Sequence, residues 1–243
     1  MGTAGMTGRT TETSPRFKAR IGGVFYLLVF LTGGVAVPSF RLVVDSDAAA
    51  TASNILAHEA LFRLGFAALL INVVVYIAVT LIFYELFKPV NGSLSLCAAF
   101  FSLVGCAIQA VSSAFFLAPL VVLGGAPSVS VFKVEQLQAQ ALMFFKLYAQ
   151  AYNIGLVFFG FYCLLIGYLI FRSTFLPRIL GALMAFAGLG WLTFLWPPLA
   201  NHLSSYNLAA GILGEGSLTL WLLAMGVNAH RWKEQARAAG DWR

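Results

Sequence analysis

The sequence predicts an all-α fold: a polytopic membrane helical bundle with six transmembrane helices, short cytoplasmic turns and two longer outer loops that contain helical segments. Hydrophobic residues make up 60% of the 243 residues and charged residues 10%, and the mean hydropathy is +0.86. A soluble domain of this length cannot bury so much apolar surface. Uncharged apolar runs long enough to cross a bilayer follow one another along the chain, and most Lys and Arg residues stand at their ends.

The chain begins with residues 1–15, which are rich in Thr, Gly and Ser and are expected to form a disordered cytoplasmic tail. The first apolar run, 21–40, follows three basic residues, as the apolar core of a cleaved signal peptide does. This run is long for a signal peptide, and the segment Val-Ala-Val-Pro at 35–38 is a poor cleavage site, so we predict a permanent span. Five further uncharged or nearly uncharged runs of bilayer-spanning length are predicted as spans: 64–84, 94–123, 147–171, 179–196 and 208–229. The six-span membrane domain is thus expected over 16–232, with a cytoplasmic tail over 233–243.

The links between the spans carry recognisable turn and cap residues. Pro89 and Asn91-Gly92 predict a tight turn between the second and third spans, and 173–177 is expected to do the same between the fourth and fifth. Two links on the other side are longer. Asp47 is expected to cap a helix that leads into the second span, and 134–146 is expected to form a helix that leads into the fourth.

The orientation of the bundle follows from the distribution of Lys and Arg, which are enriched in cytoplasmic loops. Eleven of the fifteen such residues fall on the side that holds both termini: Arg9, Arg16, Lys18, Arg20, Lys88, Arg172, Arg178, Arg231, Lys233, Arg237 and Arg243. The other side holds Arg41, Arg63, Lys133 and Lys146. Both termini are therefore predicted to be cytoplasmic.

Several function classes find no support in the sequence. The net charge of +6 sits at helix ends rather than on one face, so no nucleic acid is expected as a partner. Cys97, Cys106 and Cys163 lie in apolar segments without CxxC spacing, and no metal or other cofactor is expected. The HExxH, GxSxG, P-loop and GxGxxG motifs do not occur. The sequence therefore favours a protein that is not an enzyme.

Two features of the sequence keep metal or haem binding and intramembrane proteolysis as alternatives. His58, His202 and His230 carry imidazole groups that bind haem or metals in other proteins, although a lone His near a membrane interface is more often solvated. His58-Glu59 with Arg63 resembles the Glu-Glu-x-x-x-Arg element of intramembrane abortive-infection-type proteases. In this chain, however, the first Glu is replaced by His.

Four segments together resemble one known family. They are 54–65, the turn 88–91, the stretch 158–170 with Phe175-Leu176-Pro177-Arg178 after it, and 214–222, which reads Gly-Glu-Gly-Ser-Leu-Thr-Leu-Trp-Leu. They are similar to the bacterial membrane proteins grouped as domain of unknown function 4386, over about 20–227. The resemblance implies a multi-pass protein of the bacterial inner membrane. It supplies no catalytic residue, cofactor or activity.

A set of polar side chains near the outer side of the predicted spans forms a candidate site. Lys146, Gln150 and Asn153 recur at i, i+4 and i+7 and share a helix face. Glu59 and Arg63, next to His58, have the spacing of a helical ion pair.

Glu215 lies inside the sixth span, about 12 Å from its expected outer end at 1.5 Å per residue. A charge at membrane depth costs about 2.5 to 3.5 kcal/mol, so Glu215 needs a partner or a proton. We expect it to point into the bundle, with Arg63 as its preferred partner and Lys146 as the alternative.

Three functions are compatible with these residues. The polar cluster favours a small binding or transport-type protein with a site near the outer leaflet, in which these residues line a pathway for a small-molecule or ion ligand or for protons. The same cluster would also suit a structural or interaction subunit that contacts other membrane proteins or further copies of itself, with Glu215 paired only to hold the helices together. An intramembrane enzyme is the third alternative. The lipid bilayer is a partner in all three.

Overall fold

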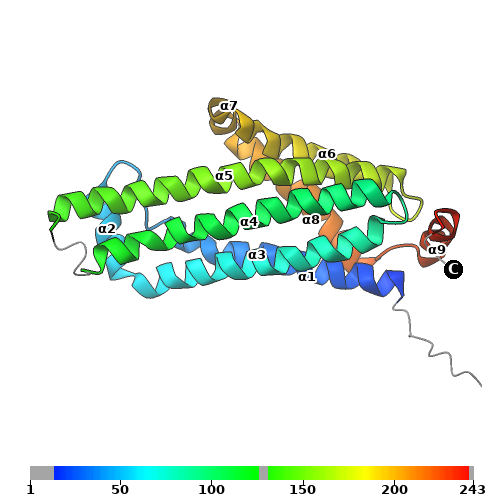
Figure 1. The fold of residues 1–243 in the computed structure, drawn as a ribbon, viewed down its shortest axis with the longest axis horizontal. Coiled ribbons are helices and arrows are strands. Elements are labelled where there is room, and N and C mark those ends of the chain that lie inside the picture. The colour runs from blue at the N-terminus through cyan, green and yellow to red at the C-terminus, as the bar shows by residue number, and fades with distance from the viewer. Residues whose placement is uncertain (1–13, 126–130, 241–243) are drawn as a thin grey trace, which may run out of the picture.

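The computed structural model describes residues 14–125 and 131–240, and these residues are almost entirely helical. The long helices are α1 (Pro15–Phe40), α3 (Glu59–Phe87), α4 (Gly92–Leu123), α5 (Val134–Arg172), α6 (Arg178–Leu192) and α8 (Ser204–Ala224). The short helices are α2 (Ala48–Ala57), η2 (Thr193–Leu195), α7 (Pro197–His202) and α9 (Ala229–Ala238) (Figure 1). The expected tail at 1–15 lies, up to residue 13, outside the described residues.

The prediction of six spans in an all-α bundle is confirmed. Among the described residues, six helices are long and apolar enough to cross a membrane, the fifth being α6 extended by η2 to Leu195. Their outward faces carry exposed apolar side chains such as Val74, Val111 and Leu220, each at least 64% exposed. A water-soluble protein would not present so much apolar surface. The chain is therefore an integral membrane protein.

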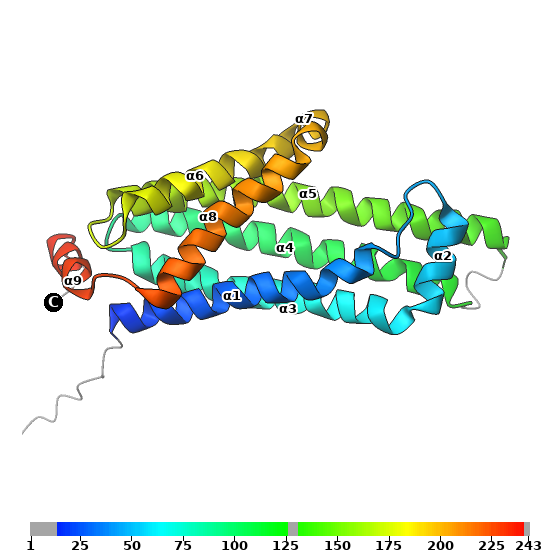
Figure 2. The same cartoon turned by 180° about the vertical axis from the view of Figure 1, so that it is seen from behind.

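The six spans form a closed ring in chain order. Each packs against the next, from α1 through α3, α4, α5 and α6 to α8, and α8 returns to pack against α1. Figure 2 shows the start of α1 and the helix α9 at one end of the bundle, which we call the terminal end, and α2 at the opposite end, which we call the loop end. The ring encloses a central axis to which every span can contribute side chains.

The spans differ greatly in length. At 1.5 Å per residue, the 29, 32 and 39 residues of α3, α4 and α5 correspond to about 44, 48 and 58 Å, whereas a bilayer has a hydrocarbon core of about 30 Å. The 21 residues of α8 correspond to about 32 Å. In Figures 1 and 2 the pair α6 and α8 accordingly stops short of the loop end, while α3, α4 and α5 continue to it. The loop-end turns of these long helices lie beyond the depth of a bilayer core.

The predicted Asp47 cap is present, and Asn91 of the predicted turn also caps a helix. The Asp47 side chain accepts a hydrogen bond from the backbone N–H of Ala50 at the start of α2 (2.9 Å). The Asn91 side chain accepts one from Leu94 at the start of α4 (2.9 Å). These caps satisfy N–H groups that a helix start leaves without partners. The turn 88–91 and the helix before the second span are therefore formed as the sequence indicates.

The sixth span is shifted from its expected position at 208–229. Helix α8 occupies Ser204–Ala224, and Gly226 then adopts a positive φ of 66°. This left-handed conformation favours glycine and ends helices, which the hydrophobicity pattern alone does not reveal. The chain continues as α9, which crosses the expected boundary between 232 and 233 and is anchored by a hydrogen bond from Trp232 Nε1 to the Leu86 carbonyl (2.9 Å).

Glycines allow α5 and α6 to pack backbone against backbone. A Cβ added to Gly167 would lie 2.7 Å from the Gly181 carbonyl oxygen, and one added to Gly181 would lie 2.6 Å from that of Gly167. One heptad further along, Gly160 and Gly188 make the same close approach. Small residues at such seams let membrane helices approach closely, and this contact fixes α6 against the rest of the ring.

The interior contains two apolar clusters, one in each half of the bundle. The cluster in the terminal half includes Phe83, Ile166 and Met184. The cluster in the loop half is centred on Phe62 and Phe116, whose rings stack at 4.4 Å. Between these clusters lie polar side chains and a cavity, which form the candidate site.

Candidate functional site

The candidate site is organised around Glu215, near the middle of α8. This residue stands eleven positions after Ser204 and nine before Ala224, which places it about 16 Å from the loop side of the helix and about 14 Å from the terminal side. Its side chain is half-buried. The carboxyl group therefore lies near the middle of its span, slightly deeper than the ~12 Å expected at 1.5 Å per residue, because α8 begins at Ser204.

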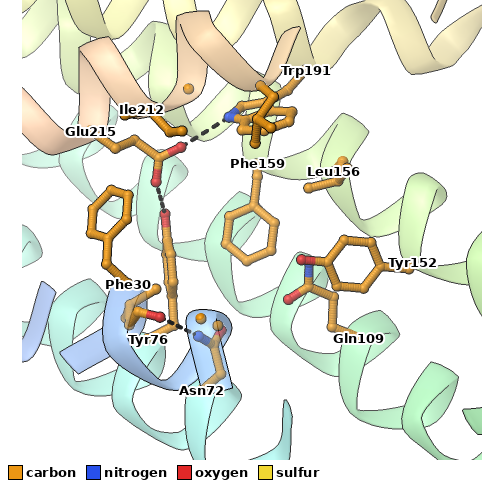
Figure 3. Close-up of a pocket in the computed structure, with 15 residues that line it drawn as sticks. Phe30, Asn72, Tyr76, Gln109, Tyr152, Leu156, Phe159, Trp191, Ile212 and Glu215 are labelled. Carbon is orange, nitrogen blue, oxygen red and sulfur yellow. Dashed lines mark hydrogen bonds between the residues drawn. The ribbon is translucent and has the colours of Figure 1, made fainter. Parts of the chain in front are cut away.

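Three neutral groups donate hydrogen bonds to this carboxyl group. The Tyr26 hydroxyl of α1 lies 2.6 Å from Oε2, and the Tyr76 hydroxyl of α3 lies 3.4 Å from the same atom. Trp191 Nε1 of α6 lies 2.9 Å from Oε1. Figure 3 shows Tyr76 and Trp191 converging on the two oxygens from different helices. Four of the six spans thus meet at a single carboxyl group.

A cavity of about 310 Å³ opens beside Glu215. All six spans contribute to its wall: Val29, Phe30, Gly33 and Gly34 from α1, Asn72 and Tyr76 from α3, Gln109 from α4, Tyr152, Leu156 and Phe159 from α5, Trp191 from α6, and Leu208, Gly211, Ile212 and Glu215 from α8. Concave sites of this size, mostly apolar with a few polar groups, are typical of small-molecule binding.

The polar groups in the wall are fixed by contacts with the helices around them. Asn72 Nδ2 donates to the Val29 carbonyl oxygen at 2.7 Å and to Thr32 Oγ1 at 2.9 Å, which ties α3 to α1. On the opposite wall, Gln109 lies next to Tyr152 (Figure 3). The amide oxygens of Asn72 and Gln109 add neutral acceptors to the cavity.

A second cavity, also of about 310 Å³, continues toward the loop end. It shares Gly33, Asn72 and Tyr152 with the first and extends to Phe40 and Asn153. Because α1 runs toward the loop end and α5 runs away from it, these residues follow one another along the bundle axis in both helices. Together the two cavities form a tract from the Glu215 carboxyl group into the loop half of the bundle.

Helices α1 and α8 are closely packed only in the terminal half. A Cβ on Gly23 of α1 would lie 2.8 Å from the backbone nitrogen of Leu223, and the guanidinium group of Arg20 donates to the Ala224 carbonyl oxygen at 3.0 Å. Beyond this contact α8 runs away from α1 toward α7 (Figure 2). The cavity-lining residues Leu208 and Ile212 of α8 are 59% and 53% exposed, so the cavity reaches the outer surface of the bundle between α1 and α8.

The predicted ion pair between Glu59 and Arg63 is confirmed. Arg63 Nε lies 2.7 Å from Glu59 Oε1, and both side chains are exposed at the start of α3. The predicted pair between Glu215 and Arg63 is wrong, and so is the alternative with Lys146. Arg63 precedes Tyr76, the α3 contact of Glu215, by thirteen residues, or about 20 Å along the helix. The expectation failed because α3 and α5 extend well beyond the depth at which Glu215 lies.

The remaining predicted site residues divide between the tract and the surface. Asn153 lines the second cavity. Lys146 and Gln150 are exposed on α5, and His58 is exposed at the end of α2, where its ring nitrogen Nδ1 lies 3.1 Å from the Asn54 carbonyl oxygen. The structure brings Glu215 and Asn153 to adjacent cavities and leaves the other predicted residues exposed on the surface of the bundle.

Five residues of the site were not predicted from the sequence: Tyr26, Tyr76 and Trp191, which donate to Glu215, and Asn72 and Gln109. Asn72 and Gln109 stand in the middle of otherwise uncharged spans, and polar residues at such depth are costly and usually face the bundle interior. Tyr26 and Tyr76 also lie in mid-span, away from the interfaces where aromatic anchors occur. The position of these four residues well inside a span was therefore the feature of the sequence that could have identified them.

Comparison with known proteins places this chain in a family. The model described as Domain of unknown function (DUF4386) matches residues 21–226. The chain belongs to this family. The family description assigns no activity to its members, in agreement with the resemblance noted in the sequence. No solved structure matches the chain.

A relative of this DUF4386 chain occurs in an archaeon. An uncharacterised protein of Archaeoglobus fulgidus is 24% identical over 157 residues, which cover 63% of this chain and 78% of the relative. The bacterial origin implied by the resemblance stays a prediction.

Proposed function

We propose that this protein is a small-ligand binding protein of the transport type, and that the Glu215 cavity is its site. The observation that carries the proposal is a carboxyl group in the middle of a span that receives hydrogen bonds from three neutral donors and faces a cavity walled by all six spans. We further propose that both ends of the chain lie in the cytoplasm of a bacterial inner membrane, because Lys and Arg are concentrated at the terminal end. The tract of cavities then leads from mid-depth toward the outer side.

A purely structural role would not require this residue type. Polar contacts between membrane helices contribute about 0.6 kcal/mol on average, whereas an acidic side chain at mid-depth costs about 2.5 to 3.5 kcal/mol on insertion scales. A neutral Gln could accept from Trp191 through its amide oxygen and donate to the Tyr26 hydroxyl through its amide nitrogen, at a lower insertion cost. The carboxyl group is therefore better explained by a ligand that uses its charge than by helix association alone.

The proposal is tested by filling the cavity. Gly33 lines both cavities, and a Cβ there would have Asn72 Nδ2 as its nearest neighbour at 3.7 Å, so Gly33→Leu adds a side chain without a backbone clash. Gly216→Leu is the matched control, because Gly216 lies outside the cavity wall and its Cβ would meet only Ile212 Cγ2 at 4.0 Å.

The measurement is the thermal stability of the purified protein with three probes of similar size. These are benzyltrimethylammonium, its uncharged carbon isostere neopentylbenzene, and phenylacetate. A ligand at 100 times its Kd stabilises the folded state by about 2.7 kcal/mol. We expect at least one probe to raise the Tm of the wild type and of Gly216→Leu but not of Gly33→Leu. If no probe does so, the cavity is not a small-ligand site and the proposal fails.

A further inference from the structure

We infer that the ligand of this cavity is a hydrophobic organic cation, with an ammonium-type group attached to an apolar body, and that it enters sideways from the lipid between α1 and α8. The inference rests on the proposed function and names the ligand class for the same site. It is carried by the charge of the wall, by its aromatic groups and by the side on which the cavity opens.

The first argument is charge. Glu215 is the acidic residue of the wall, and among the described residues no Lys, Arg or His lines either cavity. The donors to the carboxyl group are two phenol groups and one indole, so none of them supplies a positive charge. A carboxyl group at this depth must either take up a proton or face a counter-charge, and a cationic ligand provides the counter-charge that the residues lining the two cavities do not supply.

Four basic groups on the surrounding spans have partners away from Glu215, and a fifth, Lys146, is exposed. On α1, Lys18 pairs with Glu85 at 2.7 Å, and Arg16 and Arg20 donate to carbonyl oxygens at the end of α8. On α3, Arg63 pairs with Glu59 at the loop end. On α5, Lys146 is exposed and precedes Tyr152, the first wall residue of the Glu215 cavity on that helix, by six residues, or about 9 Å. None of these five groups lines either cavity, so the negative site near the middle of α8 is left for a ligand.

The second argument is the aromatic wall. Phe30, Tyr76, Tyr152, Phe159 and Trp191 line the cavity around Glu215, and the rings of Tyr76 and Phe159 meet edge to face at 4.6 Å. The faces of such rings attract cations, Trp most strongly, and aromatic cages with this composition bind quaternary ammonium groups.

A small metal ion fits this wall poorly. Hard cations such as Ca²⁺ take six to eight oxygen ligands, and Mg²⁺ takes an octahedral set. The cavity offers a single carboxylate whose two oxygens already accept hydrogen bonds, together with the amide oxygens of Asn72 and Gln109 on separate walls. An organic cation, which is attracted by charge and by ring faces without a full oxygen shell, matches these groups better.

The third argument is access. The cavity reaches the lipid-facing surface where α8 leaves α1, beside the exposed apolar side chains of Leu208 and Ile212. On the α1 side of this opening, Gly34 has no side chain and a Cβ there would have no neighbour within 4 Å. A ligand that enters from hydrocarbon must partition into it, which requires an apolar body next to the cationic group.

The experiment measures equilibrium binding of benzyltrimethylammonium and of neopentylbenzene, which has the same shape without the charge. The wild type is compared with Glu215→Gln, and with Glu59→Gln as a control that neutralises a carboxylate of the loop-end surface pair. We expect the wild type and Glu59→Gln to bind the cation at least tenfold more tightly than the isostere. In Glu215→Gln the affinity for the cation should fall at least tenfold while that for the isostere changes little.

Phe159→Leu provides a second variant that keeps the carboxylate, in case Glu215→Gln does not fold. It removes one aromatic face of the wall, so binding of the cation should weaken severalfold and more than binding of the isostere. Equal affinity of the wild type for both probes would overturn the cation inference and leave the proposed function standing. If neither probe shows binding that is lost in Gly33→Leu, both the cation inference and the proposed function are overturned.

Discussion

The Tyr26 hydroxyl lies 2.6 Å from a carboxylate oxygen of Glu215, although 189 positions separate the two residues in the sequence. Tyr26 belongs to the first span and Glu215 to the last, so this hydrogen bond closes the ring of helices at mid-depth. Because Tyr76 and Trp191 donate to the same carboxyl group, the closure of the bundle and the geometry of the candidate site depend on the same side chains.

The first prediction concerns the stability that this closure provides. Tyr26→Phe removes the shortest hydrogen bond to Glu215, and a hydrogen bond to a charged group contributes about 1.5 to 3 kcal/mol. We expect the free energy of unfolding, measured by titration with a denaturing detergent, to fall by about that amount. Tyr76→Phe should cost less, because its oxygen lies 3.4 Å from the carboxylate. Tyr168→Phe is the control, since this side chain is 49% exposed, and a loss equal to that of the control would contradict the prediction.

The second prediction separates Glu215 from the ion pair at the loop end. Residues farther apart than about 10 Å usually show additive effects within about 0.5 kcal/mol, whereas residues in one hydrogen-bond network couple by about 0.5 to 3 kcal/mol. We expect the double-mutant cycle of Arg63→Met with Glu215→Gln to be additive, and that of Tyr26→Phe with Glu215→Gln to be strongly non-additive. Both cycles are read from unfolding free energies under identical detergent conditions. Coupling between positions 63 and 215 would mean that Arg63 does reach the carboxylate.

The features predicted correctly from the sequence are local ones. Each span is a run of apolar residues, the Asp47 cap joins residues three positions apart, and the turn at 88–91 lies within four residues, so a short window of sequence contains the relevant information. The Glu59 and Arg63 pair is also local, because i and i+4 neighbours share a helix face. The end of the sixth span was predicted incorrectly, because it is set by the positive φ of Gly226 and the prediction used hydrophobicity alone.

The partners of Glu215 depend on how four helices are staggered, which no local pattern encodes. The sequence analysis identified Glu215 as costly and in need of a partner, and it searched for a cation near the span ends. In the structure, α3, α5 and α8 have 29, 39 and 21 residues. Because their lengths differ, a residue at the start of α3 or α5 does not lie level with a residue at the start of α8. Tyr26 and Tyr76 matched Glu215 in depth, but as neutral side chains they were not considered as its partners.

The third prediction is the topology of the chain. Single cysteines placed at Gly92, at Thr174 and at the C-terminus should be protected in intact cells from a membrane-impermeant maleimide, whereas cysteines at Asp47 and Ser204 should react. The reason is the excess of Lys and Arg at the terminal end. Ser128, on the same expected side as Asp47, lies outside the described residues. The background variant replaces Cys97, Cys106 and Cys163, and an outward-facing Gly92 would invert the orientation and the predicted side of the cavity tract.

The last prediction tests how Trp191 is held against Glu215. Gly211 of α8 packs under the indole ring, and a Cβ at this position would collide with the Trp191 Cζ2 atom and lie 2.9 Å from Cη2. Gly211→Ala should therefore displace the ring, weaken the hydrogen bond from Nε1 to Glu215 and lower the unfolding free energy by about 1 to 3 kcal/mol, the usual cost of overpacking. Gly216→Ala is the control five residues further along α8, where an added Cβ would meet only Ile212 Cγ2 at 4.0 Å.

The same clash predicts a specific non-additivity. The atoms Cζ2 and Cη2 belong to the six-membered ring of the indole, and the smaller side chain in Trp191→Phe reaches less far under the helix, so this variant loses the hydrogen bond but also relieves the collision. We expect the double variant Gly211→Ala with Trp191→Phe to be more stable than the sum of the two single effects indicates. Strict additivity would show that the ring does not rest on Gly211, and that the Trp191 contact with Glu215 is maintained by other residues.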